Sequence, residues 1–327
     1  LPEGDPIEGW IAFDGYNYMT TEMTGLGFSS LTPGKGYDLY TESDEVFTFG
    51  GQFNVSDVEV DLSYRDGVPT LYGYNLIGNP FPSGLDWNAV LNSEYFPYPE
   101  ETSSTIFFTR NNEPAVYAAG VGIPADVTGI IPPMQGFFTK TYNSGNSITL
   151  PAAARTHDNI HDRYKGAPEE IPLVRLAVSE GQMKDETVVR FDARAKTGLD
   201  YGFDAIKLFY SPAKTGIFTL ESGSKYAINA QPFPGETLEI PLAVNFVSSG
   251  SHTISCSQLQ RLSSYKVELI DKVTGLTTDL NSVKSITVNS AAGTITDRFI
   301  LKFSNLMTGI EDPVITSRAF KIYQANS

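Results

Sequence analysis

Two histidines four residues apart form the most compact set of possible metal ligands in this sequence. His157 and His161 are flanked by Asp158 and Asp162, and on a helix the two imidazoles would share one face and could bind a divalent metal. The spacing supplies no third ligand, because the remaining histidine, His252, lies far along the chain. We therefore interpret this pair as part of a solvated, charged surface segment.

A second set of possible ligands consists of three aspartates around one glycine-containing loop. Asp192, Asp200 and Asp204 would supply the hard oxygen ligands that calcium prefers, although their spacing is not that of an EF-hand. The alternative is that Asp200 and Asp204 accept backbone hydrogen bonds in a tight turn while Arg190 or Arg194 balances their charge. We favour this structural interpretation and expect no cofactor, with calcium as the possible exception.

Nucleophilic catalysis has no support in the residue spacing. Cys256 follows His252 by four residues on an alternating stretch, so in a strand their Cα atoms would lie about 13 Å apart at about 3.3 Å per residue. We therefore expect Cys256 to be a small buried apolar residue. The chain also lacks a Walker A loop, a G-x-S-x-G elbow, an H-E-x-x-H motif and a Rossmann glycine fingerprint. We expect a protein that is not an enzyme.

Aromatic residues are the richest candidates for ligand binding. Flat rings on the loops of a β-sandwich can stack against sugars, and exposed Tyr and Trp residues also anchor protein interfaces. The alternative is that most of these rings pack in the core or rim of a tyrosine-rich β protein. The candidate ligand-binding residues are Trp10, Tyr16, Tyr37, Tyr40, Tyr95 and Tyr98.

Composition and charge restrict the possible partners. The chain of 327 residues has 23 Lys and Arg against 38 Asp and Glu, a formal net charge of -15 at pH 7. Nucleic acid and anionic membrane surfaces are therefore improbable partners. The least charged long stretch, 114–138, is interrupted by Asp126 and by Pro124, Pro132 and Pro133, so we expect no membrane span. A single cysteine excludes an internal disulfide.

Alternation with a period of two residues recurs along the whole sequence, and helical periodicity is nearly absent. In the stretch 58–64, Val58, Val60, Leu62 and Tyr64 would share one face, and the Asp-Gly pair at 66–67 follows as a turn. The C-terminal half contains further predicted strands at 173–179, 186–193, 204–210, 217–221, 238–244, 252–257, 265–271, 285–288 and 298–303. The fold class is therefore all-β.

Interruptions in this pattern suggest where domains begin and end. Residues 152–170, where alternation gives way to charge, Ala and Pro, would be a linker or strap. We expect two β-sandwich domains in tandem: a jelly-roll-like or similar sandwich over 1–151 and an immunoglobulin-like sandwich over 171–305. Residues 306–327 would be a second linker and the beginning of a further domain. Because the chain begins without Met or an apolar leader, we expect a mature product or an excised piece.

The segment 74–88 (YNLIGNPFPSGLDWN) combines closely spaced turn formers with Phe81 and Trp87. Its apolar spacing favours packing of Trp87 over the edge of a sandwich, and the functional alternative is a ligand platform around the two rings.

This segment also resembles one found in large Bacteroidota proteins exported by the type IX secretion system. The order and spacing of further blocks resemble the region before the sorting domain of those proteins: 132–138 (PPMQGFF), 187–191 (TVVRF), 202–208 (GFDAIKL), 226–229 (YAIN), 271–275 (DKVTG) and 297–303 (DRFILKF). Residues 308–310 (TGI) and 320–323 (FKIY) resemble the junction and first strand of the sorting domain, whose other strands are missing from this sequence.

The resemblance implies an extracellular, cell-surface protein that reaches its location through the type IX secretion machinery. It implies an adhesin-like or stalk module that presents or spaces a binding surface and contacts glycan or a host or matrix protein. Two alternatives stay open: a noncatalytic accessory region of a larger secreted hydrolase, with carbohydrate binding as one option for its role, and a subunit of a cell-surface filament.

Overall fold

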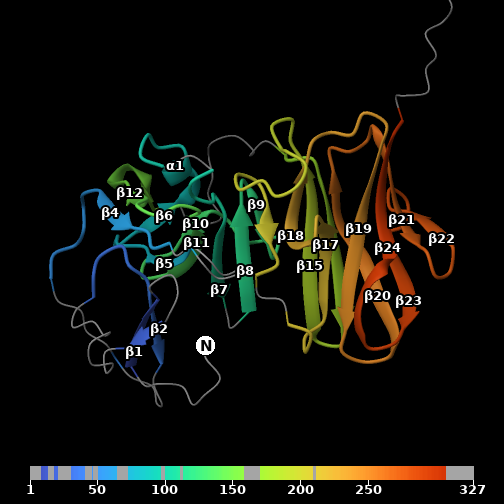
Figure 1. Ribbon diagram of the computed structural model, residues 1–327, viewed down its shortest axis with the longest axis horizontal. Coiled ribbons are helices and arrows are strands. Elements are labelled where there is room, and N and C mark those ends of the chain that lie inside the picture. The colour runs from blue at the N-terminus through green and yellow to red at the C-terminus, as the bar shows by residue number, and fades with distance from the viewer. Residues whose placement is uncertain are drawn as a thin grey trace, which may run out of the picture.

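The computed structural model describes residues 9–13, 18–20, 31–40, 46, 51–64, 73–96, 100–110, 113–157, 170–208 and 211–306, and nearly all of its regular structure is β-strand. The expected all-β class is thus confirmed. Figure 1 shows an N-terminal half built from several small sheets beside a C-terminal half of longer strands. Within the described ranges, no helix is long and apolar enough to cross a membrane.

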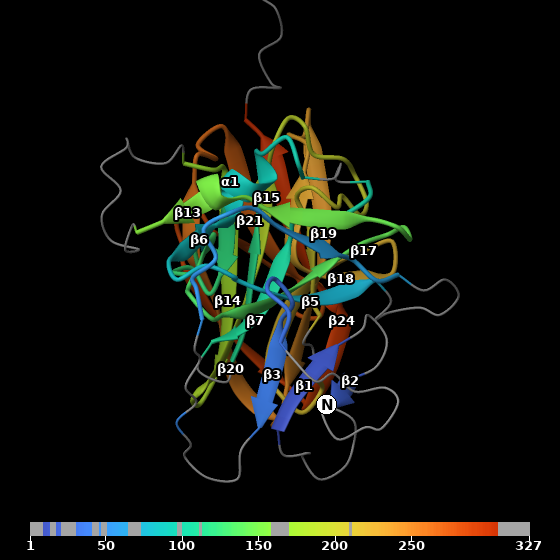
Figure 2. The same ribbon diagram turned by 90° about the vertical axis from the view of Figure 1, so that its left-hand side faces the viewer.

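The described residues of the N-terminal half form four sheets and one short helix. The sheets have the orders β2-β1-β3, β5-β11-β7-β8-β9, β10-β6-β13 and β12-β4. The elements are β1 Gly9–Phe13, β2 Tyr18–Thr20, β3 Tyr37–Tyr40, β4 Val58–Asp61, β5 Tyr74–Gly78, β6 Gly84–Asp86, α1 Trp87–Leu91, β7 Ile106–Arg110, β8 Glu113–Ala118, β9 Val121–Ile123, β10 Ile130–Ile131, β11 Gly136–Lys140, β12 Ser147–Leu150, the 3-10 turn η1 Ala152–Ala154, and β13 Arg155–Thr156. Figure 2 views this half from its outer side.

Trp87 is the centre of the N-terminal core. Its side chain has no exposed surface, and its indole N–H donates to the carbonyl oxygen of Ser104 at 2.7 Å. Its ring meets those of Phe96 and Phe137 edge-on, at centroid distances of 5.8 and 5.3 Å. Phe81 is also buried. The packing interpretation of Trp87 and Phe81 is therefore confirmed, and a ligand platform on these rings is excluded by their burial.

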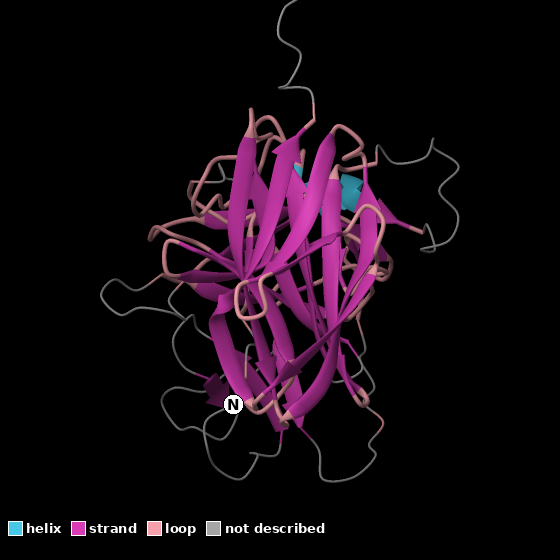
Figure 3. Cartoon of the chain, turned by 90° about the vertical axis from the view of Figure 1, so that its right-hand side faces the viewer, coloured by secondary structure: helices cyan, strands magenta, loops and turns pink. Residues whose placement is uncertain are grey.

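The C-terminal half is one sheet of eleven strands, ordered β22-β21-β24-β19-β17-β18-β15-β14-β20-β23, with β16 attached to β18. Figure 3 shows these long strands from the outer side of this half. The strands are β14 Leu173–Glu180, β15 Met183–Phe191, β16 Ala205–Ile206, β17 Gly216–Glu221, β18 Ser224–Gln231, β19 Thr237–Phe246, β20 Gly250–Gln260, β21 Tyr265–Asp271, β22 Leu276–Asp279, β23 Ser285–Ser290 and β24 Gly293–Asn305.

Strand β18 joins two layers of this sheet. Its first residues pair with β17 in the hairpin register Thr219↔Tyr226, and its last residues run parallel to β15 from Val188↔Ile228 onward. The layers β20-β14-β15 and β21-β24-β19-β17 thereby enclose one apolar core to which both contribute. This half is sandwich-like, with its layers hydrogen-bonded into one sheet. Two tandem sandwiches, the second immunoglobulin-like, stay a prediction.

Most predicted C-terminal strands form, and the errors have local causes. The strand predicted over 204–210 is wrong within its described part, because only Ala205–Ile206 pairs and a bond from Leu208 N to Ile206 O closes a tight turn. Strand β18 was missed because six of its eight residues are buried, so neither face alternates with solvent. The strand beginning at 186 in fact begins at Met183.

The start of the expected linker belongs to the N-terminal half. Arg155 and Thr156 pair with Leu85 and Gly84 of β6, and Ala154 is buried in the N-terminal core. The boundary expected at residue 151 therefore moves to Thr156 or beyond, and residues 158–169 lie outside the described part.

A third apolar core lies between the two halves. It combines residues of the five-stranded sheet with residues of the C-terminal sheet: Tyr74, Phe107, Val116, Ala118, Val121 and Ile123 with Leu173, Val188, Ala205, Ala227 and Ile228. In Figure 1, β7, β8 and β9 accordingly stand directly beside β15 and β18. The halves are packed against each other, and we call this packed region the junction.

Candidate functional site

Arg175 of β14 reaches across the junction to a backbone carbonyl of the other half. Its Nη2 donates to Gly122 O in β9 at 2.9 Å, its Nη1 pairs with Glu186 at 2.8 Å, and its Nε donates to Gln258 at 3.2 Å. The residue is only 4% exposed. Because each guanidinium nitrogen has a partner, the cost of burying this charge is offset by directional bonds, one of which fixes the opposite half.

Arg190 of β15 makes a similar bond to the turn between β8 and β9. Its Nη1 donates to Ala119 O and its Nη2 pairs with Asp192 at 3.2 Å. Ala119 has φ 43° and Gly120 has φ 92°, the left-handed backbone of a tight hairpin turn that presents this carbonyl. The guanidinium also lies over the ring of Phe203 at 5.2 Å. Two buried arginines thus hold one β-hairpin of the N-terminal half.

The loop before β16 forms a third attachment. Ser104 Oγ donates to Gly202 O at 2.7 Å, and Ser104 N donates to Tyr201 O at 3.2 Å. Beside them, Thr105 Oγ1 donates to Asp204 O at 2.6 Å. Since these bonds run alongside an apolar core and two buried guanidinium groups, rotation of one half against the other would break several buried contacts together.

A cavity of about 570 Å³ lies at the junction. We call it the junction cleft. Its apolar floor comes from Phe107, Val116, Ile123, Ile206 and Ala227, and its rim includes the segments 113–115, 182–186, 207–208 and 214–216. The cleft therefore has the size and the mixed lining typical of ligand sites at domain interfaces.

The charges on the rim of the cleft are mostly paired. Lys207 Nζ lies 2.6 Å from Asp185, and Lys214 Nζ lies 3.5 Å from Glu113 of the opposite half. Lys184 forms no ion pair with any residue in the described ranges. Among the described residues, the ammonium group of Lys184 is therefore the one at the mouth of the cleft without an ion-pair partner.

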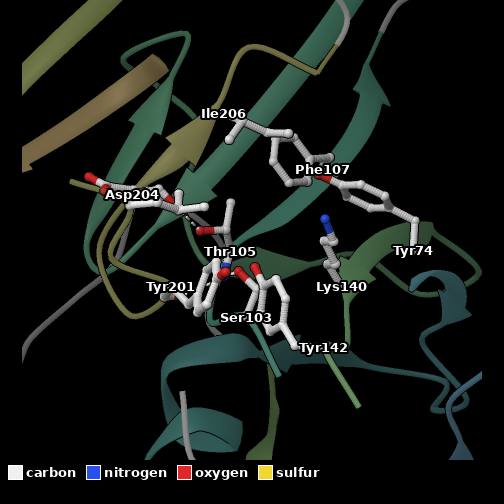
Figure 4. A pocket seen from close by; sticks show the side chains of 10 residues that line it. Tyr74, Ser103, Thr105, Phe107, Lys140, Tyr142, Tyr201, Asp204 and Ile206 are labelled. Atoms are coloured by element: carbon white, nitrogen blue, oxygen red, sulfur yellow. Dashed lines mark hydrogen bonds between the residues drawn. The ribbon is translucent and has the colours of Figure 1, made fainter. Parts of the chain in front are cut away.

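A smaller pocket of about 30 Å³ adjoins the cleft across Phe107 and Ile206 (Figure 4). The rings of Tyr142 and Tyr201 stack on one side of it, with centroids 3.7 Å apart. Lys140 Nζ lies 5.2 Å from the centre of the Tyr74 ring. This volume holds about one water molecule, so the pocket is too small for an organic ligand.

Titratable groups around this pocket are shifted by burial. Burial lowers the pKa of Lys140 and raises the pKa of Tyr74 and Tyr142. Burial also raises the pKa of Asp204 to about 7, although backbone N–H groups donate to its carboxylate. Figure 4 shows this carboxyl group turned away from Lys140, so the two do not form an acid–base pair.

Comparison with known families places the chain in one family, whose function is unknown. A family model described as "Domain of unknown function (DUF8693)" matches residues 13–303. The chain belongs to this family. No curated protein and no solved structure matches it. Because the DUF8693 match spans both halves, the junction and its cleft lie inside the family's unit.

In this DUF8693 chain, Asp192 is engaged by arginines. Arg194 pairs with its carboxylate at 2.9 Å and Arg190 at 3.2 Å. The pKa of Asp192 is lowered to about 2, mainly by the hydrogen bond from the Arg194 side chain. The arginines therefore balance Asp192, and not Asp200 or Asp204 as the structural interpretation expected.

Asp200 and Asp204 accept backbone hydrogen bonds, as that interpretation predicted. Asp200 accepts from Lys196 N at 3.0 Å, and Asp204 accepts from Asp200 N at 2.7 Å and from Ala230 N at 2.6 Å. Within the described part of the chain, no three His, Cys, Asp or Glu side chains are grouped to hold a metal ion. No cluster of ligands in the described residues supports calcium binding, which stays an untested expectation.

Several of the candidate aromatic residues come together on the sheet β2-β1-β3. Trp10 is opposite Leu39, and Tyr37 and Tyr40 are opposite Ala12 and Gly9. Tyr37 Oη accepts a hydrogen bond from Thr32 N at 2.8 Å. The other candidates are separate: Tyr95 follows α1 and is 50% exposed, and Tyr16 and Tyr98 lie outside the described residues.

The histidine and cysteine predictions have mixed outcomes. His161 and the aspartates at 158 and 162 lie outside the described residues, so the metal pair is not tested. His252 is buried in β20 and stacks on Phe246 at 3.8 Å. Cys256 is a buried free cysteine, as expected.

The junction was missed in the sequence, although a signal for it was present. Arg175 and Arg190 each interrupt an apolar strand, LVRLAV and TVVRF. A charged residue inside a buried strand needs a partner, and this rule predicts a polar contact without saying where the partner lies.

Proposed function

We propose that this chain is a non-catalytic spacer that holds a binding surface at a fixed distance and orientation. The observation that carries the proposal is the locked junction, in which Arg175 and Arg190 bond to backbone carbonyls of the opposite half. Packed domains within a chain move against each other unless their interface is large and apolar. The two halves share an apolar core and are joined by buried hydrogen bonds from charged side chains. Their relative orientation is therefore fixed, as a stalk requires.

The proposed location is extracellular, on the cell surface. It is supported by the resemblance of residues 74–303 to the region before the sorting domain of type IX secretion substrates. In this proposal the partners are a glycan or a host or matrix protein, contacted through an adhesin-like surface. Tyr37, on the strand that pairs with the strand of Trp10, is the aromatic candidate for that contact.

The test of the spacer role is a distance distribution between the halves. Spin labels on Asp61→Cys and Thr277→Cys, both exposed and one in each half, would be measured by double electron–electron resonance in a Cys256→Ala background. We expect one narrow distribution. A broad distribution in a folded sample would contradict the rigid spacer, and reproducible turnover of a polysaccharide or peptide library by the purified chain would contradict a non-catalytic role.

A further inference from the structure

The junction cleft lies where strand β18 leaves strand β15. The parallel pairing of the two strands begins at Val188↔Ile228, and before that point β18 pairs with β17. Residues 183–187 of β15 pair with β14 on one side and with no described strand on the other. This unpaired edge faces the cleft, because residues 182–186 line it.

The direction of the backbone groups along this edge follows from two hydrogen bonds. Phe191 N donates to Pro172 O, toward β14, and Asp192 N donates to Gln231 O, toward β18. Since backbone groups alternate between the two sides of a strand, the N–H and C=O groups of Lys184 and Glu186 point away from β14. Consistent with this, Glu186 O accepts from Lys207 Nζ at 3.1 Å.

Three of these four backbone groups have no partner in the described part of the chain. They are the N–H and C=O of Lys184 and the N–H of Glu186. Their two-residue spacing is the repeat of an extended chain. Unpaired backbone groups beside a preformed cavity are the arrangement that takes up an added strand.

The opposite wall of the cleft, the edge of β8, is less suited to pairing with an added strand. Residues 113–115 of β8 also pair on one side only, with β7, because β9 begins opposite Val116. Pro114 at the centre of this stretch has no N–H, and proline is a usual device for blunting a strand edge. The β8 edge therefore bounds the cleft without pairing, and an added strand would form its backbone hydrogen bonds with β15.

We propose that the junction cleft binds an extended peptide of another protein, which adds to β15 beside Lys184 and Glu186. One apolar side chain of the peptide would rest on Phe107, Val116 and Ile123, so that the peptide continues the apolar interface between the halves. An acidic side chain would meet the ammonium group of Lys184, which has no ion-pair partner among the described residues. The cleft volume of about 570 Å³ lies within the usual range for ligand sites.

The chemistry of the lining favours a peptide over a sugar or a purely apolar molecule. A purely apolar ligand would leave the N–H and C=O groups of Lys184 without partners when it displaced water from them. A sugar usually requires a flat exposed ring, whereas Phe107 is buried and only 4% exposed. An extended peptide satisfies both the polar edge and the apolar floor.

The probe for this proposal is a phage-displayed library of random heptapeptides, panned on the full chain. Selected peptides would be synthesised and titrated by calorimetry against the wild type, Lys184→Glu and the control Lys272→Glu. Lys272 is exposed after β21, between that strand and β22, and does not line the cleft. We expect acidic–apolar peptides that lose at least tenfold in affinity with Lys184→Glu and keep it with the control.

A second measurement tests the strand-addition mode on the peptide itself. N-methylation of successive peptide nitrogens removes one donor at a time, so we expect a loss of tenfold or more at alternate positions only. Failure to select any saturably binding peptide, equal effects of the two lysine variants, or no alternation along the peptide would each overturn the proposal. None of these outcomes depends on the rigidity of the junction, so the spacer role stands or fails separately.

Discussion

Replacing Arg175 by Met removes the best-satisfied buried charge of the junction. The variant loses the bond to Gly122 O at 2.9 Å and leaves Glu186, now 2.8 Å from a guanidinium nitrogen, without its cation. At 4% exposure of Arg175, water cannot replace these bonds without opening the junction. The variant should therefore destabilise the fold and weaken the attachment of β9.

The expected magnitude follows from the exposure of each partner. A hydrogen bond to a charged group contributes about 1.5–3 kcal/mol, and removal of one partner from a buried ion pair costs about 3–5 kcal/mol. Because the Glu186 side chain is 24% exposed, water partly solvates the carboxylate that is left. We therefore expect Arg175→Met to lower the free energy of unfolding by about 3 kcal/mol, the lower end of that range.

Arg261→Met is the matched control. Arg261 pairs with Glu170 at 3.1 Å, but the two side chains are 59% and 63% exposed. Exposed pairs contribute less than about 1 kcal/mol, so this variant should be nearly neutral.

The assay is urea unfolding followed by far-ultraviolet circular dichroism and by tryptophan fluorescence. The two tryptophans, Trp10 and Trp87, both belong to the N-terminal half, so fluorescence reports on that half and circular dichroism on the whole chain. We expect coincident wild-type transitions, since the halves share a core. Equal unfolding free energies for Arg175→Met and Arg261→Met would refute the reasoning.

Three further predictions concern single buried groups. Burial raises the pKa of Asp204 to about 7, above the unfolded value of about 3.9, so its contribution to stability is greatest below about pH 4 and is lost as pH rises through 7. Urea unfolding at several pH values should show this slope in the wild type but not in Asp204→Asn. Cys256 should react with Ellman's reagent far more slowly in the folded chain than in urea, because it is buried and its thiol pKa is raised by burial; equal rates would contradict its packing. Trp87→Phe should cost about 1–3 kcal/mol in urea unfolding, because it leaves the buried Ser104 carbonyl without its donor, and an unchanged midpoint would count against that bond.

The strands could be predicted where one face of a strand meets water. In β4, Val60 is buried while Glu59 and Asp61 are exposed. Apolar and charged residues therefore alternate along this stretch of the sequence, and this alternation predicts a strand. Strand β18 is buried on both faces, so its sequence carries no such contrast. The buried roles of Trp87 and Cys256 could also be predicted, because their residue types and apolar neighbours favour burial wherever the chain folds.

The sequence by itself determined the all-β class, the approximate positions of most C-terminal strands and the acidic character of the surface, because these properties depend on residues near one another in the chain. Only the tertiary structure decided the junction and its cleft. The donor on Arg175 and its acceptor on Gly122 are separated by 53 residues, and the unpaired edge of β15 exists because β18 turns away toward β17. Such features depend on which strands become neighbours in space, and local alternation carries no information about that choice.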